Sequence, residues 1–333
     1  MANRACPLSR SRDVLTLHCQ DGKVLPESDD LPEKAVWIDL LNPTREEELH
    51  LEAQLGVLIP TREDMEEIET SSRLYVENGT AFMTAQVAFY GGHAFLQSGP
   101  VTFCLVNKRL VTVRYIDPAS FAIFCGHIEK QPVLATDGVT TFLNLIDVII
   151  DRTADLIEKT EDNVDAVSKA IFRVKREAKL ENALIEIGNA QNSIAKIRDS
   201  LVSLARLVTF AHSLDDSVLG ESDGALRDTR VRLRTMGQDV ASLSDHASYI
   251  TGNMSFLLDA ALGLISVEQN NVMKLISVVS VIFLPLTLIA SIYGMNFVDM
   301  PFLKDPAAFG WTIAAMIVIA AGLIWWLRSR RWI

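Results

Sequence analysis

The sequence has few cysteines and no paired spacing that would build a disulfide framework or a structural metal site. The spacings of Cys125-Gly-His127 and of His18-Cys19 do not fit a zinc finger. We therefore expect free thiols in a reducing compartment and no structural zinc. The four cysteines are Cys6, Cys19, Cys104 and Cys125.

Other absences exclude whole classes of function. No GxxxxGK[ST] loop is present, so the sequence shows no nucleotide-binding motif that could drive pumping with ATP. The first twenty residues lack the apolar core of a secretory signal. The net charge of −11 argues against a nucleic-acid partner. It is compatible with a cytoplasmic domain that attracts cations. No cluster of His, Cys or carboxylate residues has catalytic spacing, and we expect no enzyme.

Proline is also absent between Pro132 and Pro285, and apolar residues recur there at helical spacing. A break at HSLDDSVLGESDGA separates two expected helices from a third that starts near Leu226. If the third runs to Ile292, it is on the order of 100 Å long at 1.5 Å per residue. One stripe of the first helix is formed by Leu145, Ile149, Leu156, Ile157, Val164 and Val167.

The first 131 residues mix strand and helix signals. The runs AVWIDLL, AFMTAQVAFY, VTFCLV and RLVTVRYI are rich in β-branched and aromatic residues, and turn signals such as ENGT and YGGH separate them. The segments PTREEELHLEAQLG and TREDMEEIETSSRLY read as helices with threonine N-caps and a glutamate three residues on. These signals predict a mixed α/β domain.

Two long uncharged runs lie near the end of the chain, from Leu275 to Ile292 and from Ala308 to Leu327. A helix needs roughly 20 apolar residues to cross a bilayer, so both are predicted to span. The basic tail RSRRWI follows directly, and such clusters stay on the cytoplasmic side. We expect both termini in the cytoplasm of a bacterial inner membrane, with Trp325, Trp326 and Trp332 near the inner leaflet.

A stripe at heptad spacing begins just before the first run and continues along it, and it gathers polar and small residues on one face. Small residues let membrane helices pack closely, so the stripe is either a packing seam or the lining of a pore. Because two helices cannot enclose a pore, a pore requires several copies of the chain. The stripe consists of Asn270, Met273, Ser277, Ser280, Leu284, Thr287 and Ser291.

Gly294-Met295-Asn296 follows the stripe. Glycine and asparagine at a helix end often form a simple cap and turn. Several copies of Asn296 around an axis would instead present a ring of neutral amide oxygens. Mg²⁺ sheds its water reluctantly, so such a ring would bind the hydrated ion, and weak successive sites favour conduction.

Together these segments resemble the CorA family of magnesium channels, over nearly the whole chain. The resemblance implies a homopentamer with a funnel-shaped cytoplasmic domain, an α/β layer above long helices, and one pore lined by the first span. It implies passive uptake of Mg²⁺, with Co²⁺ and Ni²⁺ as minor cargo and no cofactor, and closure by Mg²⁺ bound between cytoplasmic domains. It is carried by VWIDLLNPT, TREDMEEIETSSRLY, EQNNVMKLISVVSVIFLPLTLIASIYGMNF, MP and RRWI.

The same resemblance assigns roles. By this resemblance, residues 294–296 form the selectivity mouth, and Asn270 matches the asparagine at the cytoplasmic end of the pore. Met273 and Leu284 fall at hydrophobic constrictions, where apolar rings gate by dewetting. Thr287 falls at a polar ring between constriction and mouth.

The outer loop departs from the family pattern. Phe302 stands where members commonly have glutamate, in Met-Pro-Glu-Leu, and Val298 stands at another acidic position. Asp299 and Asp305 would still attract cations, against the charge of Lys304. Asp305 also fits the N-cap of the second span.

The regulatory site is not placed by the sequence. Where the family has an acidic partner on the long helix, this chain reads Arg234-Thr235, with Asp239 one turn away. His246, beside Asp245, is expected on a solvated or intersubunit face.

The resulting expectation is an α+β cytoplasmic domain with a long helical stalk and two C-terminal transmembrane helices. A zinc-transporting member of the superfamily, which usually has Gly-Ile-Asn at the mouth, is the alternative cargo. A membrane-anchored helical scaffold or sensor that conducts nothing is the alternative of another class. The expected parts are the α/β domain (1–131), stalk (132–271), first span (272–292), outer loop (293–307), second span (308–327) and basic tail (328–333).

Overall fold

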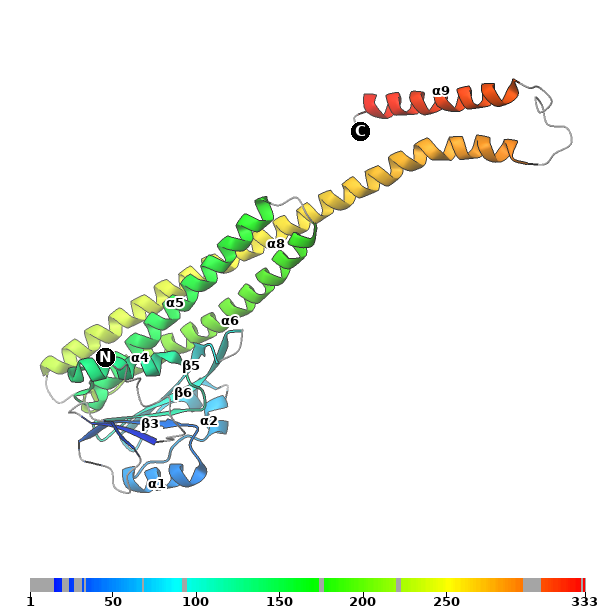
Figure 1. Ribbon diagram of the computed structural model, residues 1–333. Helices are drawn as coiled ribbons and strands as arrows, with labels where there is room; N and C mark the ends of the chain where they lie inside the picture. The colour runs from blue at the N-terminus through cyan, green and yellow to red at the C-terminus, as the bar shows by residue number, and fades with distance from the viewer. Residues whose placement is uncertain are drawn as a thin grey trace, which may run out of the picture. The chain divides into compact units, whose positions relative to one another are not determined.

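The computed structural model of the protein divides into two compact units (Figure 1). The first contains Met1–Val174 with Glu181–Leu257, and the second contains Lys175–Leu180 with Leu258–Ile333. The residues that the structure describes are 15–19, 24–26, 32, 34–67, 69–91, 95–173, 177–219, 223–295, 307–330 and 332.

A mixed sheet organises the first unit. The strands lie in the order β2-β1-β3-β7-β6-β5-β4, and β3 pairs with β7 in parallel whereas the other described pairs are antiparallel. All four strands expected from the β-branched and aromatic runs are present. In chain order the strands are β1 (Leu15–Cys19), β2 (Val24–Pro26), β3 (Ala35–Leu41), β4 (Leu74–Glu77), β5 (Thr80–Phe89), β6 (Gln97–Val106) and β7 (Arg109–Arg114).

The turn predicted at ENGT joins β4 to β5. Asn78 and Gly79 have φ angles of 50° and 77°, and Glu77 faces Thr80 across the hairpin. Positive φ at both central positions is the geometry of a type I′ turn, which asparagine and glycine tolerate best.

Two short helices cover one face of the sheet. α1 (Arg45–Leu55) and α2 (Arg62–Glu66) bury apolar side chains against residues from the strands. Both helices begin with a capping box at a threonine, as the sequence predicts. The core of this face includes Leu17, Ile38, Leu40, Leu51, Leu55, Met65, Phe82, Cys104 and Val113.

The segment 61–75, expected as one helix, is broken. α2 ends at Glu66, α3 occupies only Thr70–Arg73, and Leu74 already belongs to β4. Because Leu74 and Tyr75 pair with β5, the end of this segment is a strand and not a helix. The second capping box is also closed by Asp64, where the expectation was a glutamate.

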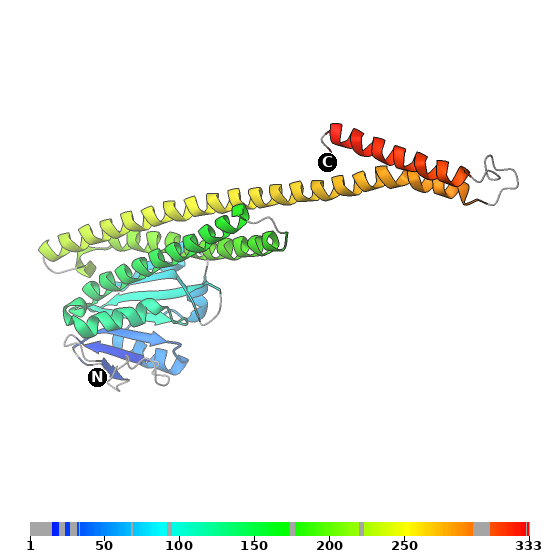
Figure 2. The same cartoon turned by 45° about the horizontal axis from the view of Figure 1, so that its top comes forward.

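The other face of the sheet carries the longer helices (Figures 1 and 2). α4 (Ala119–Lys130), the short 3₁₀ helix η2 (Pro132–Ala135) and the first turns of α5 (Gly138–Arg173) pack here. Phe142 stands edge-on to Phe103 with ring centroids 5.9 Å apart. Because successive strand residues point to opposite faces, Phe103 lies on this face and Cys104 on the other.

α5, α6 (Glu177–Ser213), α7 (Asp216–Leu219) and the start of α8 (Asp223–Tyr293) complete the first unit. Ser200 and Ser203 accept hydrogen bonds from backbone amides of β5, which attaches α6 to the sheet. The expected break after α6 and the expected helix from near Leu226 to Ile292 are confirmed. All members of the predicted α5 stripe are buried.

A buried ion pair joins β3 to β7. Arg114 and Asp39 are 1% and 4% exposed, and Arg114 donates from Nε and Nη2 to the Asp39 carboxylate, the latter at 2.8 Å. Thr112 donates to the same carboxylate at 2.7 Å. Burial acts to lower the pKa of Arg114, but the charge and hydrogen bonds of Asp39 and Asp117 raise it by more, so the guanidinium keeps its proton.

Gly138 is required where α5 begins, because its backbone touches β7. A Cβ added there would lie 2.7 Å from the Cα of Arg109 and the nitrogen of Leu110. Gly138→Ala is therefore expected to lower the thermal unfolding midpoint of the full chain by several degrees, because about 1–3 kcal/mol is typical of overpacking. Gly188→Ala is the control, since a Cβ meets nothing within 4 Å on α6 and alanine favours helix. Equal midpoints in the two variants would contradict this packing argument.

The second unit contains the rest of α8 and α9 (Ala308–Ser329). Both helices contain a stretch long and apolar enough to cross a membrane. Only 6% of each stretch is buried by the rest of the chain. The helices extend beyond the predicted spans by one residue at Tyr293 and by two residues at Ser329.

Candidate pore helix and selectivity segment

The seven stripe residues all lie on α8 in the second unit. Their mean spacing of 3.5 residues differs from the helical period by about 20° per heptad, so they keep to one face over three heptads. Met273 and Leu284 are 61% and 67% exposed. Of the seven, only Ser277 is partly covered; Asn270, Ser280, Thr287 and Ser291 are exposed like the two apolar members.

The side chains that the chain itself covers lie on another face of α8. Val278 is 8% exposed, and Ile282, Leu286 and Ile289 are partly buried. The stripe is thus the face that one copy of the chain leaves open.

Two hydroxyl groups on the stripe bond back to their own helix. Ser277 Oγ donates to the carbonyl of Met273 and Thr287 Oγ1 donates to the carbonyl of Phe283, each at 2.8 Å. The bond uses the hydrogen of each hydroxyl and leaves its oxygen lone pairs as acceptors. Acceptor oxygens on an open face can receive hydrogen bonds from the water shell of a cation.

α8 continues through Pro285 and ends at Tyr293. Gly294 then donates its amide hydrogen to Ala290 at 3.0 Å, and Met295 donates to Ile292 at 3.3 Å. A Cβ at Gly294 would lie 3.2 Å from the carbonyl oxygen of Ala290, so glycine fits this turn best. The described part of the Gly-Met-Asn segment therefore forms a tight turn on the last coil of the helix.

The remaining candidates of the outer loop lie outside the described residues. These are Asn296, Asp299, Phe302 and Asp305.

The acidic residues that the structure describes form no regulatory metal site. Within the part of the chain that the structure describes, no three His, Cys, Asp or Glu side chains are grouped so that they could hold a metal ion. His246, expected on a solvated or intersubunit face, is half-buried and lies 3.0 Å from Glu161 of α5. It therefore helps to join α8 to α5.

Two arrangements were missed by the sequence reasoning. The Asp39–Arg114 pair left no local signal, because its members are far apart in sequence and meet only through strand pairing. An arginine cluster at the start of α8 did leave a signal in RDTRVRLR, where arginines recur at helical spacing. That spacing places Arg227, Arg230 and Arg234 along one side of the helix.

Comparison with known proteins gives concordant matches. A family model described as CorA-like Mg²⁺ transporter protein matches residues 32–331. The magnesium transport proteins CorA of Escherichia coli K12 and Salmonella typhimurium LT2 are each 31% identical over 297 residues, which cover 89% of this chain and 91% of each relative. The complete CorA magnesium transporter structure from Methanocaldococcus jannaschii has a TM-score of 0.77 at 16% identity, covering 97% of this chain and 100% of that one.

Proposed function

The chain belongs to the CorA-like family of Mg²⁺ transporters, and on that premise we propose that it conducts Mg²⁺ passively into the cell through a pore built from several copies. As a family member it is a membrane transporter and not an enzyme. The observation that carries the proposal is the open stripe on α8. A membrane-length helix with acceptor oxygens on an uncovered face needs other copies of itself, and these would enclose a hydrated path.

The assembly is proposed to be a homopentamer with the stripe residues facing its axis. Met273 and Leu284 would each form an apolar ring that closes the path when it dewets. Asn270 would mark the inner end, and Thr287 would form a polar ring closer to the mouth. Ser277, Ser280 and Ser291 would supply hydroxyl oxygens between these rings.

At the outer end, residues 294–296 would form the selectivity mouth, with Asn296 binding Mg²⁺ through its water shell. Amide oxygens are neutral, so they hold a divalent ion weakly enough for it to leave. Asp299 and Asp305 would raise the local cation concentration before the mouth. Co²⁺ and Ni²⁺ are proposed as minor cargo.

Transport would take place in a bacterial inner membrane, with both termini cytoplasmic. The division proposed from the sequence places 1–131 and 132–271 in the cytoplasm and 293–307 outside. A potential of 100 mV, negative inside, would favour each divalent ion by about 4.6 kcal/mol, from about 2.3 per charge. No chemical fuel is needed. Cytoplasmic Mg²⁺ is proposed to close the pore, at a site not yet placed.

Ion flux into sealed liposomes tests the proposal. The purified full chain is reconstituted without ATP, and dyes for Mg²⁺ and Zn²⁺ are enclosed under an imposed inside-negative potential. We expect Mg²⁺ uptake that stops when the potential and the Mg²⁺ gradient are both removed. Uptake of Zn²⁺ alone would assign the chain to zinc transport. No uptake of either ion would favour the non-conducting scaffold.

A further inference from the structure

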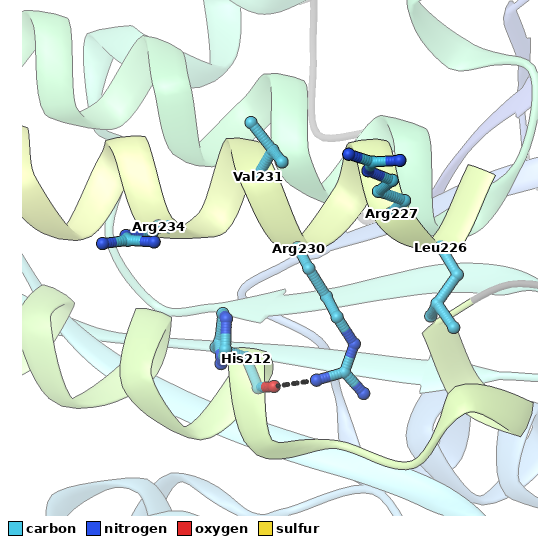
Figure 3. A pocket seen from close by; sticks show the side chains of 6 residues that line it. All are labelled: His212, Leu226, Arg227, Arg230, Val231 and Arg234. Carbon is cyan, nitrogen blue, oxygen red and sulfur yellow. Dashed lines mark hydrogen bonds between the residues drawn. The ribbon is translucent and has the colours of Figure 1, made fainter. Parts of the chain in front are cut away.

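The first unit carries an arginine cluster that the proposed pore does not use. It lines a pocket of about 410 Å³ between the end of α6 and the start of α8 (Figure 3). The cluster is locally positive although the whole chain has a net charge of −11. The lining residues are His212, Leu226, Arg227, Arg230, Val231 and Arg234.

The three arginines differ in what they already bind. Arg230 donates to the carbonyl of His212 at 3.2 Å and to the Asp216 carboxylate at 2.6 Å, so it holds the connection between α6 and α8. Arg227 and Arg234 are exposed, and neither forms a hydrogen bond or ion pair with a residue that the structure describes. Two of the three guanidinium groups are therefore available to a partner.

The available groups form a strip and not a single anion site. Arg227 and Arg234 are two turns apart, about 10 Å along the helix, and Figure 3 shows their guanidinium groups apart from that of Arg230. Val231 lies between them and is 58% exposed. We call Arg227, Val231 and Arg234 the arginine strip. Its length and its apolar centre suit an extended acidic protein surface better than one phosphate group.

A surface of that kind exists on the same chain. Residues 63–69 include five exposed acids. Asp64 is used in the capping box of α2, and Glu66 lies 3.2 Å from Arg62. The carboxylates of the other three form no hydrogen bond or ion pair with a residue in the described part of the chain. These three, which we call the acidic turn, are Glu63, Glu67 and Glu69.

Within one chain the two surfaces lie on opposite sides of the sheet. The acidic turn belongs to α2 and its end, and Met65 of α2 is buried in the core on the α1 side. α8 packs on the side of α5, where Arg232 lies 2.6 Å from Asp147 (Figures 1 and 2). The strip and the turn therefore cannot meet in the same copy.

We propose that the arginine strip of one copy docks on the acidic turn of a second copy. Because two different surfaces of each chain are used, the contact is heterologous, and repeating it around an axis generates a ring. The inference rests on the proposed homo-oligomer and adds the surfaces through which its first units meet. The ion pairs are direct, so they weaken in high salt and need no divalent ion.

Zero-length crosslinking of the full chain in mild detergent tests this contact. Arg227→Lys and Arg234→Lys keep the charge and provide amines that a carbodiimide joins to a carboxylate in direct contact. We expect a ladder of crosslinked copies on a denaturing gel, with position 234 joined to the acidic turn by mass spectrometry. The ladder should persist with a chelator and fade in high salt. Arg198→Lys, at another exposed arginine on α6, is the control and should add no crosslink to the acidic turn.

Charge reversal sharpens the test. In the crosslinkable chain, Glu63→Lys with Glu67→Lys should lower the yield of that crosslink about tenfold, as two exposed ion pairs become repulsive. In the natural background, Glu63→Lys with Glu67→Lys should weaken the assembly of the first units. Adding Arg227→Glu with Arg234→Glu reverses the charges on the other surface and should restore that assembly. No crosslink to the acidic turn, or an equal one from position 198, would overturn the inference. The proposed transport is judged separately, because Asn296→Ala should lose flux and keep the crosslink.

Discussion

Replacing Asn296 with alanine is expected to abolish Mg²⁺ uptake while leaving assembly of the chain intact. The substitution removes the amide oxygen that is proposed to bind the water shell of the ion at the mouth. It does not alter α8, which ends at Tyr293, so the helices that build the pore keep their sequence. Potential-driven flux into liposomes is the measurement, and the mass of the purified complex reports assembly.

A matched control separates the mouth from a general loss of amide groups. Asn271→Ala removes an exposed asparagine of α8 that lies about 100° around the helix from Asn270 and therefore off the stripe. We expect flux close to that of the natural protein. Normal flux in Asn296→Ala would return Gly-Met-Asn to the role of a simple helix end, and loss of assembly would make the segment structural.

Replacing Arg114 with methionine is expected to destabilise the first unit by about 3–5 kcal/mol, because it leaves the Asp39 carboxylate buried without its cation. Asp39 would keep the hydrogen bond from Thr112, which does not neutralise it. Hydrogen exchange of the β3 and β7 amides in the full chain measures the loss, since the pair links these two strands.

Two further variants identify the cause. Arg152→Met breaks the exposed pair with Asp155, whose side chains are 38% and 59% exposed, and should change exchange by at most about 1 kcal/mol. Arg114→Met with Asp39→Leu removes both charges and should recover most of the lost stability. If the double variant were as unstable as the single one, lost packing and not the unpaired charge would be responsible.

Burial of His18 has a consequence for acid stability. Desolvation lowers the pKa of His18 to about 4 from its usual 6.5, and the ring stacks on Trp37 with centroids 4.2 Å apart. The folded state therefore binds this proton less readily than the unfolded state. The stability of the first unit is reduced as the pH falls from about 6.5 to about 4.

Much of this protein could be predicted from its sequence because the signals are local. The apolar runs before Tyr293 and before Arg328 exceed what a water-soluble surface tolerates, which is enough to predict two spanning helices. The heptad stripe follows from spacing alone, and Thr44 with Glu47 predicts the start of α1 through a capping box. Gly-Met-Asn, set between the spans and read together with the other matching segments, indicated the family.

Tertiary structure decided what depends on neighbours distant in the chain. The segment 61–75 has helical composition, yet strand pairing at Leu74 ended the helix, because hydrogen bonds to β5 compete for the same backbone groups. Asp39 and Arg114 look like ordinary surface charges in sequence and become the buried link between parallel strands. The arginine strip and the acidic turn were each visible as charge runs. Only the fold placed them on opposite sides of a sheet, where they cannot neutralise each other within one copy of the chain.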